Sequence, residues 1–272
     1  MTATLMDGGK VVERTGVTSP SMAAVLRSEW LKLRTVRSTW WTLAATVVLG
    51  GVLTILMCWG NADWLASEGA DESPGSFITW GMMIAQITAV VLGALLVTTE
   101  YGTGMIRTTF AAVPSRGRVL VAKSVLVVAV LFVVGTVAAL IGYFGGNYFL
   151  DREGIGMALE GDVLRAMYGS GLYLAGIGLF TVAVGFLLRH TAGTISIVLA
   201  LMLILGNMVN LVPGAFGEWL TKLMPGNAGS AISTPVSFNP NLLDPWTGFA
   251  VFCLETAVLL AAAYVVVRRR DA

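Results

Sequence analysis

The sequence predicts an all-α polytopic membrane protein with six transmembrane helices, for three reasons. Hydrophobic residues make up 56% of the 272-residue chain and charged residues 12%, with a mean hydropathy of +0.79, whereas soluble domains carry about 25% charge. Six apolar runs are long enough to cross a bilayer, which takes about 20 helical residues. Basic residues gather in alternate connections between these runs, as they do in the cytoplasmic loops of membrane proteins.

The amino-terminal region divides into two parts. Residues 1–18 are polar and without periodicity, which predicts a mobile tail. Ser19 and Pro20 then form a typical helix start, with serine as the N-cap and proline in the first turn. Over residues 19–38 apolar side chains recur at helical spacing and basic ones take mainly the other face, which predicts an amphipathic interfacial helix. Its candidate functional residues are Arg27, Glu29, Trp30, Lys32 and Arg34.

Residues 39–272 form the predicted six-span transmembrane domain. The spans are expected near residues 41–59, 77–99, 119–144, 169–188, 191–212 and 246–267. Only two acidic or basic side chains fall inside these runs. Lys123 is close enough to one end to extend to the membrane surface, whereas Glu255 lies near the middle of the last span.

The charge distribution predicts the orientation. With the amino terminus inside, only Arg152, Arg165 and Lys222 of the 17 basic residues fall on the outer side. Most of the acidic residues take that outer side: Asp63, Glu68, Asp71, Glu72, Asp151, Glu153, Glu160, Asp162, Glu218 and Asp244. The positive-inside rule therefore places both termini in the cytoplasm.

The inner connection 100–118 is more than a simple loop. Gly102 and Gly104 interrupt the incoming helix and Pro114 interrupts the chain again, which leaves room for a short helix between them. Its apolar face would carry Met105, Ile106, Thr109, Phe110 and Val113. Such a helix has two plausible uses. It can rest in the lipid headgroups, or its apolar face can insert into a soluble partner whose movement then reaches the adjoining spans.

The structures of three other connections between spans can also be predicted. The very short turn at Arg189 and His190 makes two spans antiparallel neighbours, and His190 is expected to be a helix-end residue. The outer segment 145–168 is expected to be a soluble excursion with a helix around 157–167. In the outer segment 213–245, an apolar face over 215–224 predicts short helices that either dip into the outer leaflet or lie at its surface.

Polar residues inside the spans are candidates for a transport pathway or for contacts between helices. They are Gln86, Asn207, Asn210 and Glu255. No catalytic residue or metal site is predicted. The sequence contains neither G-x-x-x-x-G-K-[ST] nor H-E-x-x-H, and its single histidine and two cysteines suggest no cluster. Nothing predicts a nucleic-acid partner.

Five stretches, in this order, resemble permease subunits of actinobacterial type-2 ABC exporters. They are RSEWLKLRTVRSTWW at 27–41, EYGTGMIR at 100–107 with PSR at 114–116 and Lys123, LRHTAG at 188–193, WLTKLMP at 219–225, and RRRDA at 268–272. The resemblance covers nearly the whole chain from residue 21 onward. It implies a permease in the bacterial plasma membrane that pairs with a second permease, identical or homologous, and moves an amphipathic or drug-like substrate out of the cell.

The resemblance also implies that ATP is hydrolysed by subunits other than this chain. Two separate ATP-binding subunits would bind ATP and Mg²⁺, so this chain itself would not be an enzyme and would hold no cofactor. The amphipathic helix and the first inner connection would dock on them, the latter as a coupling helix over roughly 103–113, and the outer short helices would map to 215–232. The contact residues would be Glu100, Thr103, Met105, Ile106, Arg107, Phe110 and Arg116.

Two other functions are compatible with the residues. A proton-coupled secondary transporter would use Glu255 as its proton carrier. A membrane scaffold or sensor would transport nothing. The secondary transporter is disfavoured because no internal repeat with matching broken helices is visible.

Overall fold

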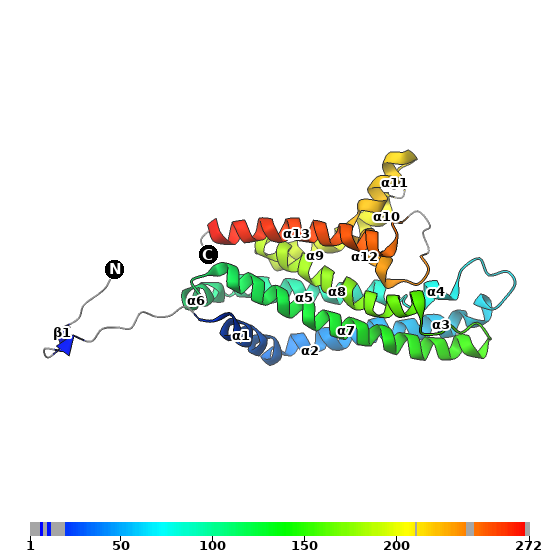
Figure 1. The fold of residues 1–272 in the computed structure, drawn as a ribbon, viewed down its shortest axis with the longest axis horizontal. Coiled ribbons are helices and arrows are strands. Elements are labelled where there is room, and N and C mark those ends of the chain that lie inside the picture. Colours follow the sequence, from blue (N-terminus) through cyan, green and yellow to red (C-terminus); the bar gives the residue numbers. More distant parts are fainter. Residues whose placement is uncertain (1–5, 8–9, 12–19, 210, 238–241, 270–272) are drawn as a thin grey trace.

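A computed structural model of the chain describes residues 6–7, 10–11, 20–209, 211–237 and 242–269 (Figure 1). The predicted tail 1–18 lies outside the described residues except for a short antiparallel pair, β1 (Met6–Asp7) and β2 (Lys10–Val11). Within the described part, six helices are long and apolar enough to cross a membrane. The predicted fold class is therefore confirmed.

The spans are built from one to three helical segments each. In chain order they are α2 (Arg37–Val47), the π-helical η1 (Val48–Val52) and α3 (Leu53–Leu65); α4 (Pro74–Phe77) and α5 (Met82–Gly102); α7 (Arg116–Arg152); α8 (Gly161–Leu188); α9 (Thr191–Leu199), the π-helical η2 (Ala200–Leu205) and α10 (Gly206–Val209); and α13 (Pro245–Arg269). The remaining helices are α1 (Met22–Thr35), α6 (Met105–Ala112), α11 (Gly214–Leu223), α12 (Pro225–Ser230) and the 3₁₀ turn η3 (Ala231–Ser233).

The third span is much longer than predicted. At 37 residues, α7 extends about 55 Å at 1.5 Å per residue, against roughly 30 Å of hydrocarbon. The outer segment 145–168 is accordingly mostly helical, because α7 continues to Arg152, and the helix expected around 157–167 is the start of α8. The reason is that helix packing continues beyond the membrane length. A Cβ added at Gly146 of α7 would meet the Cys58 sulfur of α3 at 2.8 Å.

α8 lies at the centre of the bundle, between α7 and α13 in Figure 1, and it also packs against α5. Most of its residues are buried, and glycines allow its backbone to touch its neighbours. A Cβ added at Gly93 of α5 would lie 2.7 Å from the Gly178 carbonyl oxygen of α8. The core of the protein is thus a set of close helix contacts around α8, which is how helices associate in lipid.

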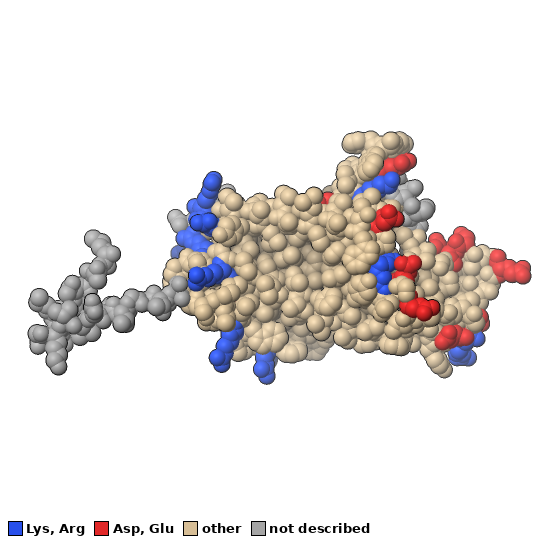
Figure 2. Space-filling view, in the orientation of Figure 1, with Lys and Arg blue, Asp and Glu red and all other residues tan. Residues whose placement is uncertain are grey.

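The two ends of the bundle differ in charge. Figure 2 shows lysine and arginine at one end, here named the basic end, and aspartate and glutamate at the other, the acidic end. Exposed tryptophans occur near both ends, including Trp40 and Trp41 near the start of the first span and Trp59 towards its other end. This arrangement is typical of helices that meet a membrane surface at each end.

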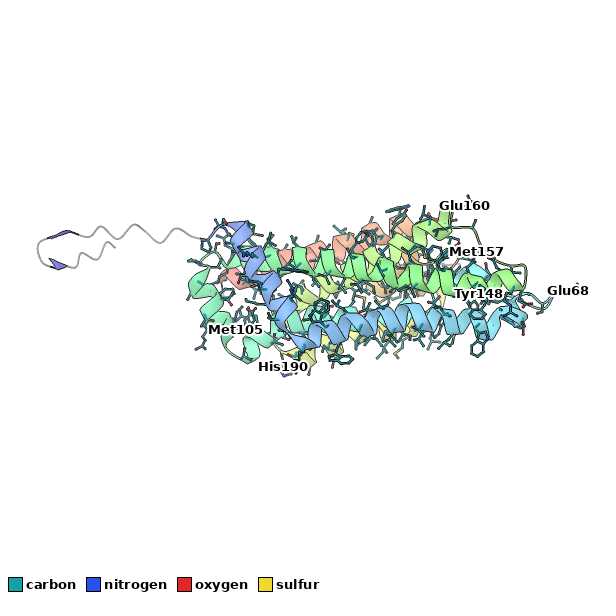
Figure 3. All side chains as sticks on the ribbon, turned by 90° about the horizontal axis from the view of Figure 1, so that it is seen from below. Glu68, Met105, Tyr148, Met157, Glu160 and His190 are labelled. Atoms are coloured by element: carbon teal, nitrogen blue, oxygen red, sulfur yellow. The ribbon has the colours of Figure 1, made fainter. Side chains whose placement is uncertain are left out.

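The basic end carries α1, α6 and the turn between α8 and α9. In Figure 3, α1 crosses this end obliquely, and Met105 and His190 lie there, whereas Glu68 and Glu160 lie at the acidic end. His190 is the N-cap of α9, and its Nδ1 accepts a hydrogen bond of 3.0 Å from the Gly193 N–H. The prediction of a helix-end histidine is confirmed.

Candidate functional site

Local sequence signals position α1 and α6 at the basic end. The predicted cap Ser19 lies outside the described residues, and Ser21 caps α1 by accepting a hydrogen bond from the Ala24 N–H. α1 ends at an extended Val36, so it is shorter than the predicted 19–38 helix. α6 begins after Gly104, whose φ of 73° favours glycine, and it ends before Pro114.

Beneath these two helices lies a group of four charged side chains, Glu29, Lys32, Glu100 and Lys123, here named the charge cluster; all but Lys32 are buried. The Nζ of Lys123 lies 2.7 Å from Oε2 of Glu29 and 2.6 Å from Oε1 of Glu100. The Nζ of Lys32 lies 2.6 Å from Oε1 of Glu29 and 2.9 Å from Oε1 of Glu100. Two positive and two negative charges therefore balance within hydrogen-bonding distance.

The charge cluster connects four helices. Glu29 and Lys32 belong to α1, Glu100 to α5 and Lys123 to α7. From α6, the Thr109 hydroxyl donates to Oε2 of Glu100 at 3.3 Å. Lys123 also donates to the Leu96 carbonyl oxygen at 2.9 Å. α1 is thus bonded to groups on two spans, α5 and α7, and α6 to one of them, α5.

Burial raises the free-energy cost of breaking these ion pairs. Glu29 and Lys123 are each 1% exposed and Glu100 is 2% exposed. A charge pair shielded from water in this way costs about 3–5 kcal/mol when one partner is removed, because the other is left buried and unpaired. Burial lowers the pKa of Lys32, but hydrogen bonds and attraction from Glu29 and Glu100 outweigh burial and raise that pKa above its ordinary value. Lys32 therefore stays charged at neutral pH.

The charge cluster corrects several expectations. Lys123 does not extend to the membrane surface, because it is paired with two carboxylates inside the protein. Glu29, a candidate residue of the interfacial helix, is buried against the bundle, and Glu100 lies beneath the surface at which a partner contact was predicted. One sequence signal could have found the cluster. Apart from Asp7, Glu13 and Asp271 near the two termini, Glu29 and Glu100 are the only acidic residues on the predicted inner side.

The other predicted residues of α1 and α6 divide between surface and interior. Arg27, Trp30 and Arg34 are exposed on α1, and Thr103, Met105 and Arg107 are exposed on or beside α6. Ile106 is 3% exposed. Phe110 is half-buried in a small apolar cluster with Val25 of α1, and the Arg116 guanidinium lies 5.4 Å from its ring centroid. The predicted apolar contact face of α6 thus covers this chain's own helix.

A groove of about 230 Å³ separates the exposed sides of α1 and α6. Its walls come from both helices, and Glu29 and Lys32 of the charge cluster are among them. The lining residues are Val25, Ser28, Glu29, Lys32, Met105, Thr108, Thr109, Ala112 and Val113. Anything that occupies this groove would contact α1, α6 and the charge cluster together.

A second cavity, of about 210 Å³, lies toward the acidic end and brings two of the predicted polar residues together. Gln86 and Asn207 both line it. The Tyr173 hydroxyl, which sequence reasoning missed, donates to Oε1 of Gln86 at 2.7 Å. The described lining contains hydroxyl, amide and apolar groups but no charged side chain: Ser76, Thr79, Trp80, Met82, Met83, Gln86, Tyr173, Met202, Leu203, Asn207, Gly226, Asn227, Ser230, Ser233, Thr234, Ser237 and Leu242.

A third predicted polar residue, Glu255, does not line this cavity. Glu255 lies on α13 and is not among the lining residues. Its Oε2 is buried without a hydrogen-bond partner in the part of the chain that the structure describes. Asn210 lies outside the described residues. Among the described candidates, Gln86 and Asn207 therefore share one cavity and Glu255 lies apart from it.

The short outer helices form the floor and rim of the cavity. α12 and η3 are largely buried against α8 and α13, whereas α11 exposes Phe216 and Trp219 at 74% and 60%. Arg165 of α8, itself 7% exposed, donates to the carbonyl oxygens of Ala231, Ile232 and Thr234. A buried arginine thus satisfies the carbonyls at the end of this helical pair, where a cation is favoured.

Comparison with known families gives one match. The family model described as ABC-2 family transporter protein matches residues 25–207. The matched region runs from α1 to α10 and includes all four members of the charge cluster. The search of curated proteins gave no significant match.

Proposed function

This chain belongs to the ABC-2 family of transporter proteins and is a membrane permease of an ABC transporter, and we propose that it exports an amphipathic substrate by using ATP hydrolysed on separate subunits. The sequence has no G-x-x-x-x-G-K-[ST] motif to hold nucleotide phosphates. We therefore assign ATP and Mg²⁺ to P-loop subunits that dock at the basic end. A second permease, identical or homologous, completes the transporter in a bacterial plasma membrane, with both termini in the cytoplasm.

The observation that supports this coupling most directly is the charge cluster. The ATP-binding subunit contacts the exposed residues of α1 and α6, including Thr103, Met105 and Arg107. Glu100 of α5 receives bonds from Lys32 of α1, Thr109 of α6 and Lys123 of α7, so a shift of α1 or α6 against α5 breaks bonds to this carboxylate. A push on the surface helices is therefore transmitted to the spans α5 and α7.

The neutral cavity supports an amphipathic cargo. Its polar groups are hydroxyls and amides, and its apolar walls include Met82 and Met202. Such a lining can hydrogen-bond a polar substituent while it packs against apolar carbon, and flexible methionine accommodates varied shapes. We assign this cavity to the route by which the cargo leaves, beneath α12.

The decisive experiment compares the two ends of the bundle. Arg107→Glu reverses an exposed charge on α6, and Arg152→Glu makes the same change on an exposed residue of the acidic end. We expect Arg107→Glu to abolish co-purification of the ATP-binding subunit and export, whereas Arg152→Glu retains both. If Arg107→Glu still co-purifies its ATPase at the wild-type level, the docking surface is elsewhere.

A further inference from the structure

The neutral cavity of about 210 Å³ lies where two spans depart from the regular α-helix. The second span is interrupted between α4 and α5, and this interruption lines the cavity with Thr79 and Trp80. Two further lining residues, Met202 and Leu203, belong to the π-helical η2 of the fifth span. Irregular backbone inside a membrane is tolerated where it is packed in protein or lines a cavity, and π-helical turns are frequent at functional sites. Both irregular segments therefore meet at this cavity.

The interruption of the second span is held in place by the first span. The Gly81 N–H donates to the Thr54 hydroxyl of α3 at 2.9 Å, and that hydroxyl donates to the Gly50 carbonyl oxygen at 2.7 Å. A Cβ added at Gly81 would clash with the same carbonyl oxygen. The backbone that carries Thr79 is thus fixed by close packing, so this wall of the cavity is preformed.

One polar side chain of that wall has no partner inside the described protein. Thr79 is 2% exposed, and its Oγ1 makes no hydrogen bond among the described residues. A buried hydroxyl in this state carries a free-energy cost, which a ligand that bonds to it would remove. Thr79 is therefore the group of the wall that a ligand would complete.

Other hydroxyls of the lining have already committed their protons. Tyr173 donates to Oε1 of Gln86 at 2.7 Å, and Gln86 is oriented by donating to the Met83 carbonyl oxygen at 2.7 Å. Three lining serines likewise donate to backbone carbonyl oxygens: Ser76, Ser230 and Ser233. Once a hydroxyl proton is committed, only the lone pairs of its oxygen remain to meet a ligand. These four hydroxyls thus offer acceptors, which favours a ligand that donates hydrogen bonds.

The cavity also limits the charge and the size of its ligand. No acidic or basic residue is among its described lining, and burying a charge without a partner is costly. Its volume of about 210 Å³ is below the roughly 300–1,000 Å³ of sites for drug-sized ligands. It therefore fits one compact neutral group instead of a whole drug-sized molecule.

From these contacts we propose that the cavity binds an uncharged substituent of the cargo that carries a hydroxyl or N–H donor, and that the Thr79 hydroxyl selects it. A ligand hydroxyl can donate to the lone pairs of the lining and also accept the Thr79 proton. An ether can accept but cannot donate, and a quaternary ammonium can do neither. The assignment of the ligand to the cargo rests on the export function proposed above, whereas the selectivity rests on the hydrogen bonds of the cavity.

Thymol and its methyl ether can test this selection, because these compact aromatic molecules differ in a single donor. Binding to the complete chain in phosphatidylcholine nanodiscs is measured by titration calorimetry against empty nanodiscs, since this lipid headgroup has no N–H or O–H donor to compete. The wild type should bind thymol more tightly than the ether, and the cation phenyltrimethylammonium should not bind saturably. Thr79→Val keeps the shape of the side chain and should weaken thymol binding roughly three- to tenfold, with a smaller effect on the ether.

Two further variants and a stability measurement separate selection from structure. Thr79→Ser retains the hydroxyl and should keep the preference for thymol. Thr88→Val removes a buried hydroxyl of α5 that bonds to Thr46 and to the Ala85 carbonyl oxygen, outside the cavity lining. It should lower the unfolding temperature without changing the preference, whereas Thr79→Val, which breaks no hydrogen bond among the described residues, should not lower that temperature.

Three results would overturn the proposal. The first is a wild type without a preference for thymol, and the second is an equal loss of that preference in Thr79→Val and Thr88→Val. The third is saturable binding of neither molecule, which would mean that the cavity holds only water.

Failure of this proposal can be distinguished from failure of the export function. ATP-dependent export by a protein whose cavity shows no preference for thymol would overturn the selectivity and leave export standing. A preference that depends on Thr79, in a protein that moves no cargo with ATP, would leave the binding site standing and contradict export.

Discussion

Lys123 of α7 and Glu100 of α5 form an ion pair of 2.6 Å, although the lysine is 1% and the glutamate 2% exposed. The pair is not isolated, because Glu29 and Lys32 of α1 complete the charge balance. Buried charges of this kind are costly to create and more costly to unbalance. Their position, directly beneath the two surface helices, makes the charge cluster a structural link between these helices and the spans. It also allows the coupling proposal to be tested, because each member can be removed separately.

Removing Lys123 should destabilise the protein strongly. Lys123→Met leaves two buried carboxylates with only Lys32, and we expect the free energy of unfolding in detergent to fall by about 3–5 kcal/mol. The double variant Lys123→Met/Glu100→Gln restores one negative charge to one positive charge and should recover most of the loss. A double variant no more stable than Lys123→Met would show that the charge balance is not what holds these helices.

The contribution of Lys32 should depend on pH only in the alkaline range. Its pKa is raised above 10.5 by Glu29 and Glu100 despite the opposing effect of burial. A raised lysine pKa stabilises the folded state below the ordinary pKa, and this contribution is lost as pH rises through the folded value. The stability difference between the wild type and Lys32→Gln should therefore be constant from about pH 7 to about 9 and shrink at higher pH. A difference that already shrinks within that range would contradict the assignment.

Arg165→Met should loosen the short outer helices. The guanidinium donates to carbonyl oxygens at Ala231, Ile232, Thr234 and Pro235, and each buried polar group left unsatisfied costs about 1–3 kcal/mol. We expect faster hydrogen exchange over α12 and η3 and a lower unfolding temperature. Arg152→Met, an exposed arginine of the same end, should change neither. Equal exchange in the two variants would mean that α12 is held by packing alone.

A substitution at Glu255 distinguishes ATP-driven export from proton-coupled transport. Its half-buried side chain has one oxygen without a partner among the described residues, so it could carry a proton, yet it lies apart from the neutral cavity. With ATP as the energy source, Glu255→Gln should keep export that depends on the ATP-binding subunit. Export that persists without that subunit and is lost in Glu255→Gln would instead establish a proton-coupled carrier.

The prediction from sequence and the structure differ most in the orientation of α6. The helix and its approximate bounds were predictable because Gly104 and Pro114 mark its ends. Its orientation was not, because the apolar face that could enter a partner serves equally well to cover α1, and Phe110 and Val113 do so. The surface left for a partner is therefore the more polar side, at Thr103, Met105 and Arg107.

The sequence by itself determined the six helices, the asymmetry of charge between the two ends and the breaks that create the surface helices. These properties depend on composition and periodicity over short stretches, so they are determined by residues that are close together in the sequence. Only the tertiary structure decided which charges pair. Glu29 and Lys123 are 94 residues apart in sequence, and they meet because α1 crosses the bundle end where α5 and α7 converge. The length of α7 has the same cause, since it depends on the packing of helices that are distant in sequence.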